Sequence, residues 1–151
     1  QRVVFEAQLE ELIRAASGTS AAVEGVIGEL DAVKATLGRS MTDGSLYEVA
    51  HSLQQQLRDA QEVLTGNELR DFYNDLPIMS VQARLWHARF DPASSAHGPT
   101  AAQKESLRIA RKLFDDTVAE LTHLVDVDYA ALKEAMDIAK VPWTPGRGLQ
   151  E

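Results

Sequence analysis

Residues 5–37 read FEAQLEELIRAASGTSAAVEGVIGELDAVKATL, and this stretch decides the fold class. Apolar or small residues recur through it at alternating steps of four and three, with one polar member, Thr19: Phe5, Leu9, Leu12, Ala16, Thr19, Val23, Val26, Leu30, Val33 and Leu37. This spacing lines one side of an α-helix. The pattern keeps its phase across Gly18, so it predicts one helix of about 37 residues, roughly 55 Å long.

Two further helices are predicted downstream of a loop at 38–45. The second begins near Ser45 and ends at Gly66, because glycine adopts the left-handed conformation that closes a helix. The third begins at Asp75, with Pro77 in its first turn, and runs to about Phe90. We expect this third helix to bury Met79, Leu85 and Trp86.

The fourth helix has the clearest start signal in the chain. Thr100 and Gln103 form a capping box, in which the hydroxyl accepts from the amide three residues on and the Gln side chain accepts from the first amide. The apolar positions of this helix extend to Val125. A short fifth helix is predicted after Asp126, ended by Pro142.

Long helices joined by short loops pack as antiparallel neighbours, and no strand-like alternation is present. The sequence therefore predicts an all-α, up-and-down antiparallel four-helix bundle with a long first helix and a short fifth C-terminal helix. Residues 1–141 would form the bundle as a single domain, and residues 142–151 a C-terminal tail. The chain opens inside a helical pattern without Met, which we interpret as part of a longer polypeptide or a processed chain.

Composition limits the classes of partner. Hydrophobic residues make up 44% of the 151-residue chain and charged residues 25%, typical of a globular protein. The net charge of −8 argues against nucleic acid or an anionic membrane as the main partner, because phosphates bind clustered Lys and Arg. No apolar run is long enough for a membrane span. The absence of cysteine excludes thiolate catalysis and disulfides.

Two Glu-x-x-His motifs, Glu48 with His51 and Glu120 with His123, raise the question of metal binding. In ferritin-like bundles such motifs point inward and help to hold two iron ions. On a helical wheel, however, both pairs fall about 140–220° from the apolar face of their helix. We therefore predict solvated polar pairs, with no metal, cofactor or catalytic residue. A ferritin-like metal-binding bundle that uses these four residues remains the alternative.

A second pattern on the first helix suggests an interaction surface. Small residues recur at steps of three and four, roughly opposite the apolar seam: Gly18, Ala21, Gly25, Gly28, Ala32 and Ala35. Each glycine inside a helix costs about 1 kcal/mol relative to alanine, which is unfavourable for a surface that meets only water. We call these six residues the small-residue strip. It docks a neighbouring domain or a partner subunit, or it contacts another helix of the same bundle, or it arises by chance in an Ala-rich helix.

The order of these signals resembles a known family. LPIMSVQARL (76–85), HGPTAAQ (97–103) and DVDYAALKEAMDIAKVP (126–142) are similar to the C-terminal helical region of secreted bacterial proteins with sortilin-type (BNR-repeat) β-propellers, which are often described as sialidase-like or glycosyl-hydrolase-like. This resemblance implies an extracytoplasmic protein with its propeller upstream. Any hydrolase activity would lie in that propeller.

The sequence thus favours a non-catalytic helical scaffold or interaction module. Its partner would be a neighbouring β-propeller domain or another subunit. Besides the metal-binding bundle, a coiled-coil oligomerisation domain is the other alternative, suggested by the long first helix.

Overall fold

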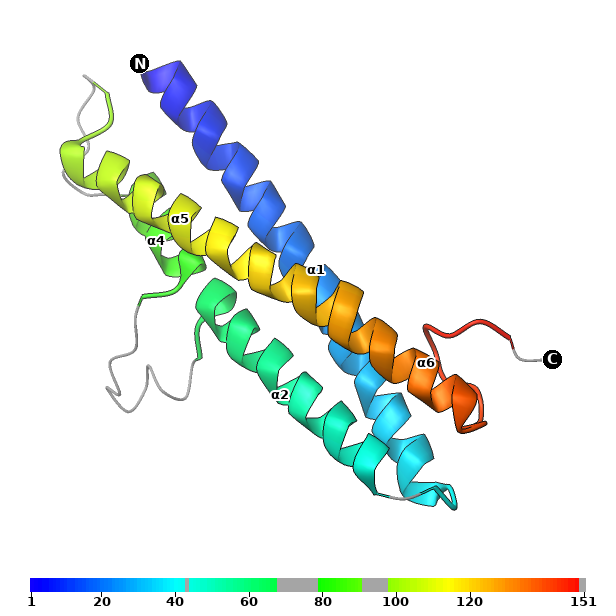
Figure 1. Cartoon of the computed structure of the whole chain (residues 1–151). Helices are drawn as coiled ribbons and strands as arrows, with labels where there is room; N and C mark the ends of the chain where they lie inside the picture. Colours follow the sequence, from blue (N-terminus) through cyan, green and yellow to red (C-terminus); the bar gives the residue numbers. More distant parts are fainter. Residues whose placement is uncertain (43, 68–78, 91–97, 150–151) are drawn as a thin grey trace. The chain divides into compact units, whose positions relative to one another are not determined.

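The computed structural model describes residues 1–42, 44–67, 79–90 and 98–149. Every regular element within these ranges is a helix (Figure 1), which confirms the all-α helical bundle. The helices are α1 (Arg2–Arg39), α2 (Ser45–Thr65), α4 (Val81–Phe90), α5 (Ala101–His123), the π-helix η1 (Leu124–Tyr129) and α6 (Ala130–Ile138). They group into two compact units. Unit 1 comprises Gln1–Ala21 and Ala60–Val118, and unit 2 comprises Ala22–Asp59 and Ala119–Glu151.

The first two helices have the predicted bounds. Helix α1 continues without a break through Gly18, and six residues of its predicted seam are buried: Leu9, Leu12, Val23, Leu30, Val33 and Leu37. Helix α2 begins at Ser45 and ends at Thr65. Gly66 follows with φ +81°, and its N–H donates to the Glu62 carbonyl at 2.8 Å. The left-handed glycine thus ends α2 as predicted.

Helix α4 begins later than predicted. Its expected start, Asp75 and Pro77, lies outside the described residues. The helix begins at Val81, and the Ser80 Oγ accepts a hydrogen bond from the Ala83 N–H at 3.1 Å, as an N-cap side chain does. Met79 therefore precedes the helix and is 41% exposed, so the prediction that it is buried was wrong.

The buried face of α4 also differs from the prediction at one position. Val81, Leu85 and Ala88 are buried, at spacings of four and three. Trp86 lies one residue past Leu85, about 100° around the helix. It is 64% exposed, so its predicted burial was wrong.

In unit 1, α4 packs antiparallel to the first part of α5. The Ser106 Oγ donates to the Arg84 carbonyl at 2.9 Å, and the Gln103 Nε2 donates to the Ala88 carbonyl at 2.9 Å.

The predicted capping box is confirmed. The Gln103 N–H donates to the Thr100 Oγ1 at 3.1 Å, and the Thr100 N–H donates to the Gln103 Oε1 at 2.8 Å. Gln103 is buried, so one side chain both caps α5 and ties it to α4.

Substitutions in this capping box should therefore differ in cost. Thr100→Ala removes one cap acceptor and should lower the free energy of unfolding by about 1 kcal/mol. Gln103→Ala should cost more, about 2 kcal/mol, because it also leaves the buried Ala88 carbonyl without its donor. Urea unfolding monitored by circular dichroism measures both. An equal or smaller loss for Gln103→Ala would mean that the bond to α4 contributes nothing.

In unit 2, α1 and α2 run antiparallel around a buried amide. Gln54 is fully buried, and its Nε2 donates to the Ile27 carbonyl at 3.0 Å and to the Asp31 carboxylate at 2.7 Å. Its Oε1 accepts from the Lys34 ammonium at 3.1 Å. Gln54 thus contacts three turns of α1, and these bonds fix the register between the two helices.

The fifth helix is not separated from the fourth by a loop. It was predicted to begin after Asp126, whereas α5 continues directly through η1 into α6. Buried residues along this stretch include Leu121, Leu124, Tyr129 and Leu132, at steps of three, five and three. The step of five matches the i to i+5 hydrogen bonds of a π-helix, which keeps Leu124 and Tyr129 on the same side.

Helix α6 ends in a Schellman motif. Ala139 is its C-cap, Lys140 adopts φ +57°, and the Val141 N–H donates to the Met136 carbonyl at 3.0 Å. The buried Val141 side chain is the apolar contact that accompanies this motif. The left-handed position is normally glycine, because a side chain there costs about 1–2 kcal/mol.

Lys140→Gly should consequently stabilise the protein by about 1 kcal/mol, since it relieves this conformation and removes no bond that the motif needs. Lys140→Gly should raise the urea midpoint. Lys133→Gly, which places a glycine inside α6, is the control and should lower the midpoint. A lower midpoint for Lys140→Gly would contradict the left-handed assignment.

Part of the predicted tail packs into unit 2. Thr144 and Arg147 are buried, and the Arg147 guanidinium donates to the Asp137 carboxylate at 2.7 Å and to the carbonyls of Val141 (2.9 Å) and Pro142 (2.7 Å). The Trp143 indole N–H donates to the Arg147 carbonyl at 2.8 Å. One cation thus holds the chain that follows α6.

The neighbouring Gly146 brings this segment against α1. Its φ is +87°, and an ideal Cβ there would lie 2.5 Å from the Glu29 carboxylate. The same carboxylate accepts from the Tyr129 hydroxyl at 2.7 Å. Burial raises the pKa of Tyr129 well above its ordinary value, and the bond to Glu29 adds to the effect, so the phenol stays a neutral donor.

Candidate functional site

The two Glu-x-x-His motifs lie on solvent-exposed faces, as the helical wheel predicted. Glu48, His51, Glu120 and His123 are all exposed. The Lys34 ammonium lies 2.9 Å from the His51 Nδ1, so that nitrogen accepts from a cation rather than facing a metal position. Within the described ranges, no group of three or more His, Asp and Glu side chains is arranged to hold a metal ion.

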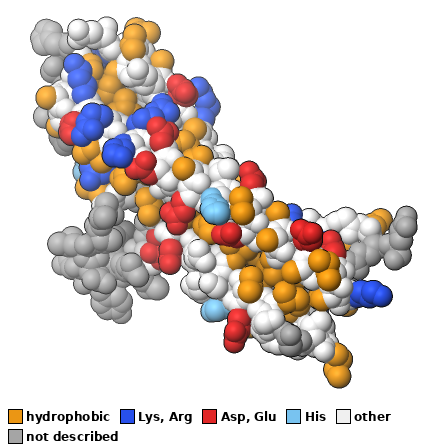
Figure 2. Space-filling view, viewed as in Figure 1, with side chains coloured by type: hydrophobic (Ala, Val, Ile, Leu, Met, Phe, Trp, Pro, Cys, Tyr) orange, Lys and Arg blue, Asp and Glu red, His pale blue; other side chains and the backbone are white. Residues whose placement is uncertain are grey.

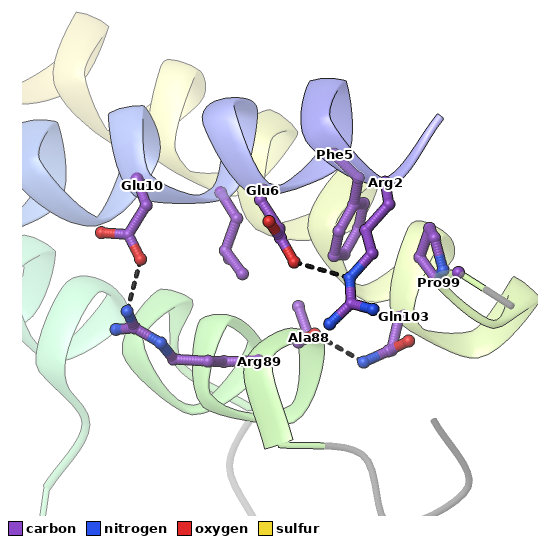
Figure 3. A pocket seen from close by; sticks show the side chains of 10 residues that line it. Arg2, Phe5, Glu6, Glu10, Ala88, Arg89, Pro99 and Gln103 are labelled. Atoms are coloured by element: carbon purple, nitrogen blue, oxygen red, sulfur yellow. Dashed lines mark hydrogen bonds and ion pairs between the residues drawn. The ribbon is translucent and has the colours of Figure 1, made fainter. Parts of the chain in front are cut away.

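A first pocket in unit 1, of about 390 Å³, lies between the start of α1, the end of α4 and the start of α5 (Figure 3). Its walls carry two ion pairs, Arg2 with Glu6 and Arg89 with Glu10. Their four charges cancel, and each side chain is about half exposed. Such exposed pairs contribute about 0–1 kcal/mol each. This pocket offers neither a nucleophile beside a base nor an uncompensated charge.

A second pocket in unit 1 is larger, about 570 Å³, and is formed by α1, the end of α2 and α4. We call it the α4 groove. Aliphatic and aromatic side chains form most of its wall, together with three hydroxyl groups, one amide and one guanidinium: Ile13, Ala16, Ser17, Ser20, Ala21, Leu64, Thr65, Gln82, Leu85, Trp86, Arg89 and Phe90. These described lining residues include no carboxylate or imidazole. The groove therefore suits apolar contact rather than acid–base chemistry.

Two exposed aromatic rings stand at the α4 groove. Trp86 and Phe90 lie one helical turn apart on α4, with ring centroids 4.4 Å apart and ring planes tilted by 48°. They are 64% and 54% exposed. The stacking orders both rings without burying them. The sequence contained a signal for this pair, because aromatic residues at i and i+4 share a helix face, and that face differs from the one of Leu85 and Ala88.

The small-residue strip lies on an open face of α1. Gly18, Ala21, Gly25, Gly28 and Ala35 are exposed, and Ala32 is half-buried. A Cβ added at any of the three glycines would meet no described atom within 4 Å. Ala21 alone among the six lines the α4 groove. The strip thus meets this groove at one residue only.

Charge is unevenly distributed over the surface. Figure 2 shows Lys and Arg side chains gathered over the first half of α5, at the upper left of the view. No helix among the described residues is long and apolar enough to cross a membrane.

Comparison with known proteins adds no assignment. No protein-family model matches the chain, and no curated protein or solved structure is significantly similar to it.

Proposed function

We propose that the chain is a non-catalytic helical interaction module, and that unit 1 docks a partner protein or a neighbouring domain through the α4 groove. The exposed Trp86–Phe90 pair beside a groove with aliphatic walls carries this proposal. Aromatic residues are enriched at the centres of protein interfaces, where they supply much of the binding energy.

The geometry of the groove supports a protein as its occupant. A row of apolar positions between helices accepts the apolar face of another helix, or a rigid loop that carries large side chains. The hydroxyl groups of Ser17, Ser20 and Thr65 supply polar contacts beside it. Two rings already held in position lose little further side-chain entropy on binding, which favours affinity.

The resemblance described above suggests which partner this is. A sortilin-type β-propeller encoded upstream in the same polypeptide, or a separate subunit that carries one, would present its surface to unit 1. The assembly would then be extracytoplasmic, and any hydrolase activity would belong to the propeller.

Trp86→Ser combined with Phe90→Ser tests the docking role. Both side chains are more than half exposed, so the variant should unfold at nearly the wild-type urea midpoint. The full-length variant is isolated from the source cells through an affinity tag. The yield of the partner that co-purifies with the wild type should fall at least tenfold. Val3→Ser, at another exposed apolar site of unit 1, serves as the control and should retain the partner.

Ala21→Glu and Gly25→Glu separate the α4 groove from the rest of the small-residue strip. Ala21 lines the groove and Gly25 does not, so Ala21→Glu alone should abolish docking if the groove is the contact. Loss of the partner in Gly25→Glu as well would extend the contact along α1. Retention of the partner in both variants would contradict the proposal. Stoichiometric iron, manganese or zinc in the purified protein would also contradict it, if the metal is lost in the double variant His51→Ala with His123→Ala.

A further inference from the structure

A basic stripe runs along α5 in unit 1. Lys104, Arg108, Arg111 and Lys112 recur at steps of four, three and one, and these steps place them on one side of the helix. The first twelve residues of α5 contain only one acidic side chain, Glu105. These cations stand out in a chain whose net charge is −8. Figure 2 shows Lys and Arg side chains over this part of α5, with Asp and Glu side chains among them.

Part of the positive charge in the stripe is not neutralised. Arg108 forms a bidentate pair with Glu105, and this hydrogen bonding lowers the pKa of the Glu105 carboxyl. Lys112 pairs with Asp116 at 3.0 Å. The side chains of Lys104 and Arg111 make no hydrogen bond or ion pair with another residue of the described ranges. Two cations of the stripe are therefore available to an anionic group.

The position of the stripe does not match the dipole of its own helix. A helix N-terminus carries partial positive charge and favours acidic side chains, whereas cations stabilise the C-terminal end. Helix α5 has no acidic residue in its first turn, and Lys104 comes directly after that turn. The helix dipole therefore does not account for cations at these positions.

The neighbouring α4 adds an arginine with an unmet hydrogen-bonding group. The Arg84 carbonyl accepts from Ser106 on α5, and the Arg84 guanidinium lowers the pKa of Glu105 through its charge, which places it beside the stripe. The Arg84 Nε is buried and has no hydrogen-bond partner among the described residues. A buried donor without an acceptor is unusual. Helix α4 contains no acidic residue, so the charge of Arg84 adds to that of the stripe.

We propose that Arg84, Lys104, Arg108 and Arg111 form a docking surface for an acidic segment of a partner protein. Lys104 and Lys112 are eight residues apart, so the stripe is about 12 Å long, which matches two turns of a helix that carries carboxylates at i, i+4 and i+7. This inference goes beyond docking at the α4 groove, because it concerns another face of α4 and specifies the charge of the partner.

The length and the surroundings of the stripe favour an acidic protein segment over nucleic acid or a membrane. The exposed Asp115 and Asp116 follow the stripe directly on α5. A phosphate polymer or an anionic bilayer extends well beyond about 12 Å and would lie directly over these carboxylates. A short acidic helix can cover the stripe without extending over them.

A synthetic helical peptide with Glu at i, i+4 and i+7, labelled for fluorescence anisotropy, tests the proposal directly. The wild-type protein should bind it at low ionic strength, and added salt should weaken the binding. Because the protein has a net negative charge, its overall charge does not attract this peptide. Lys104→Glu and Arg111→Glu should each weaken binding at least tenfold.

Arg14→Glu provides the matched control, since it makes the same charge change at an exposed site on α1 of the same unit. It should leave the affinity within twofold. Absence of peptide binding by the wild type, or an equal loss in Arg14→Glu, would overturn the proposal. Tighter binding of a single-stranded oligonucleotide or of phosphatidylserine vesicles, dependent on the same residues, would overturn it in favour of a phosphate ligand. Trp86→Ser with Phe90→Ser should bind the peptide normally, which separates this surface from the α4 groove.

Discussion

Replacement of Arg147 by Ala should lower the free energy of unfolding by about 3 kcal/mol, because it leaves buried carbonyl groups without donors. The Arg147 side chain is 1% exposed and donates to Asp137, Val141 and Pro142. The loss should appear as a lower urea midpoint and as faster hydrogen exchange in residues 141–149.

Arg147→Lys is the informative control for this prediction. It keeps the positive charge, but an ammonium cannot match the planar set of donors with which a guanidinium reaches several acceptors at once. We expect it to recover less than half of the lost stability. Full recovery by lysine would mean that the ion pair with Asp137, rather than the bonds to the carbonyls, holds the segment. Trp143 fluorescence, measured in a Trp86→Phe background, should shift as the segment detaches.

Gln54→Ala should lower the free energy of unfolding by about 2 kcal/mol, through the cavity that it leaves and the bonds that it removes. Gln54 is fully buried and bonds to Ile27, Asp31 and Lys34 of α1. Urea unfolding measures this loss, and residue-resolved hydrogen exchange of residues 22–59 shows where protection is lost.

Gln54→Met separates the two causes, since it fills the volume and forms none of these bonds. It should cost about half as much as Gln54→Ala. Wild-type stability in Gln54→Ala would contradict the network. A normal midpoint in Gln54→Met, with unchanged exchange protection in α1 and α2, would show that volume alone matters at this position.

Helix positions were largely predictable from the sequence, because they depend on local periodicity and capping. The seam of α1, the glycine after α2 and the capping box of α5 were each correctly interpreted from a few neighbouring residues. The π-helix was not predicted, although the step of five between Leu124 and Tyr129 was present in the sequence. A separate short helix was predicted after Asp126, whereas the helix continues through this stretch with one wider turn.

Contacts between elements distant in sequence were not predictable in the same way. The burial of Arg147 depends on carbonyls that Lys140 positions by its left-handed conformation. Gln54 lies beside Leu53 in an amphipathic helix, and only the position of α1 makes it a buried residue. Trp86 was expected to be buried, but the α4 groove that it borders involves three helices.

Site-specific photocrosslinking tests the central claim, docking at the α4 groove, most directly. A photoreactive phenylalanine analogue placed at position 86 or 90 of the full-length protein, irradiated in the source cells, should cross-link to one discrete protein or domain, identified by mass spectrometry. The same analogue at Ile138, which is 76% exposed in unit 2, should not form this product. The account predicts a single product from both groove positions that disappears with Ala21→Glu. Cross-linking that is absent from positions 86 and 90, or equally frequent from 138, would contradict it.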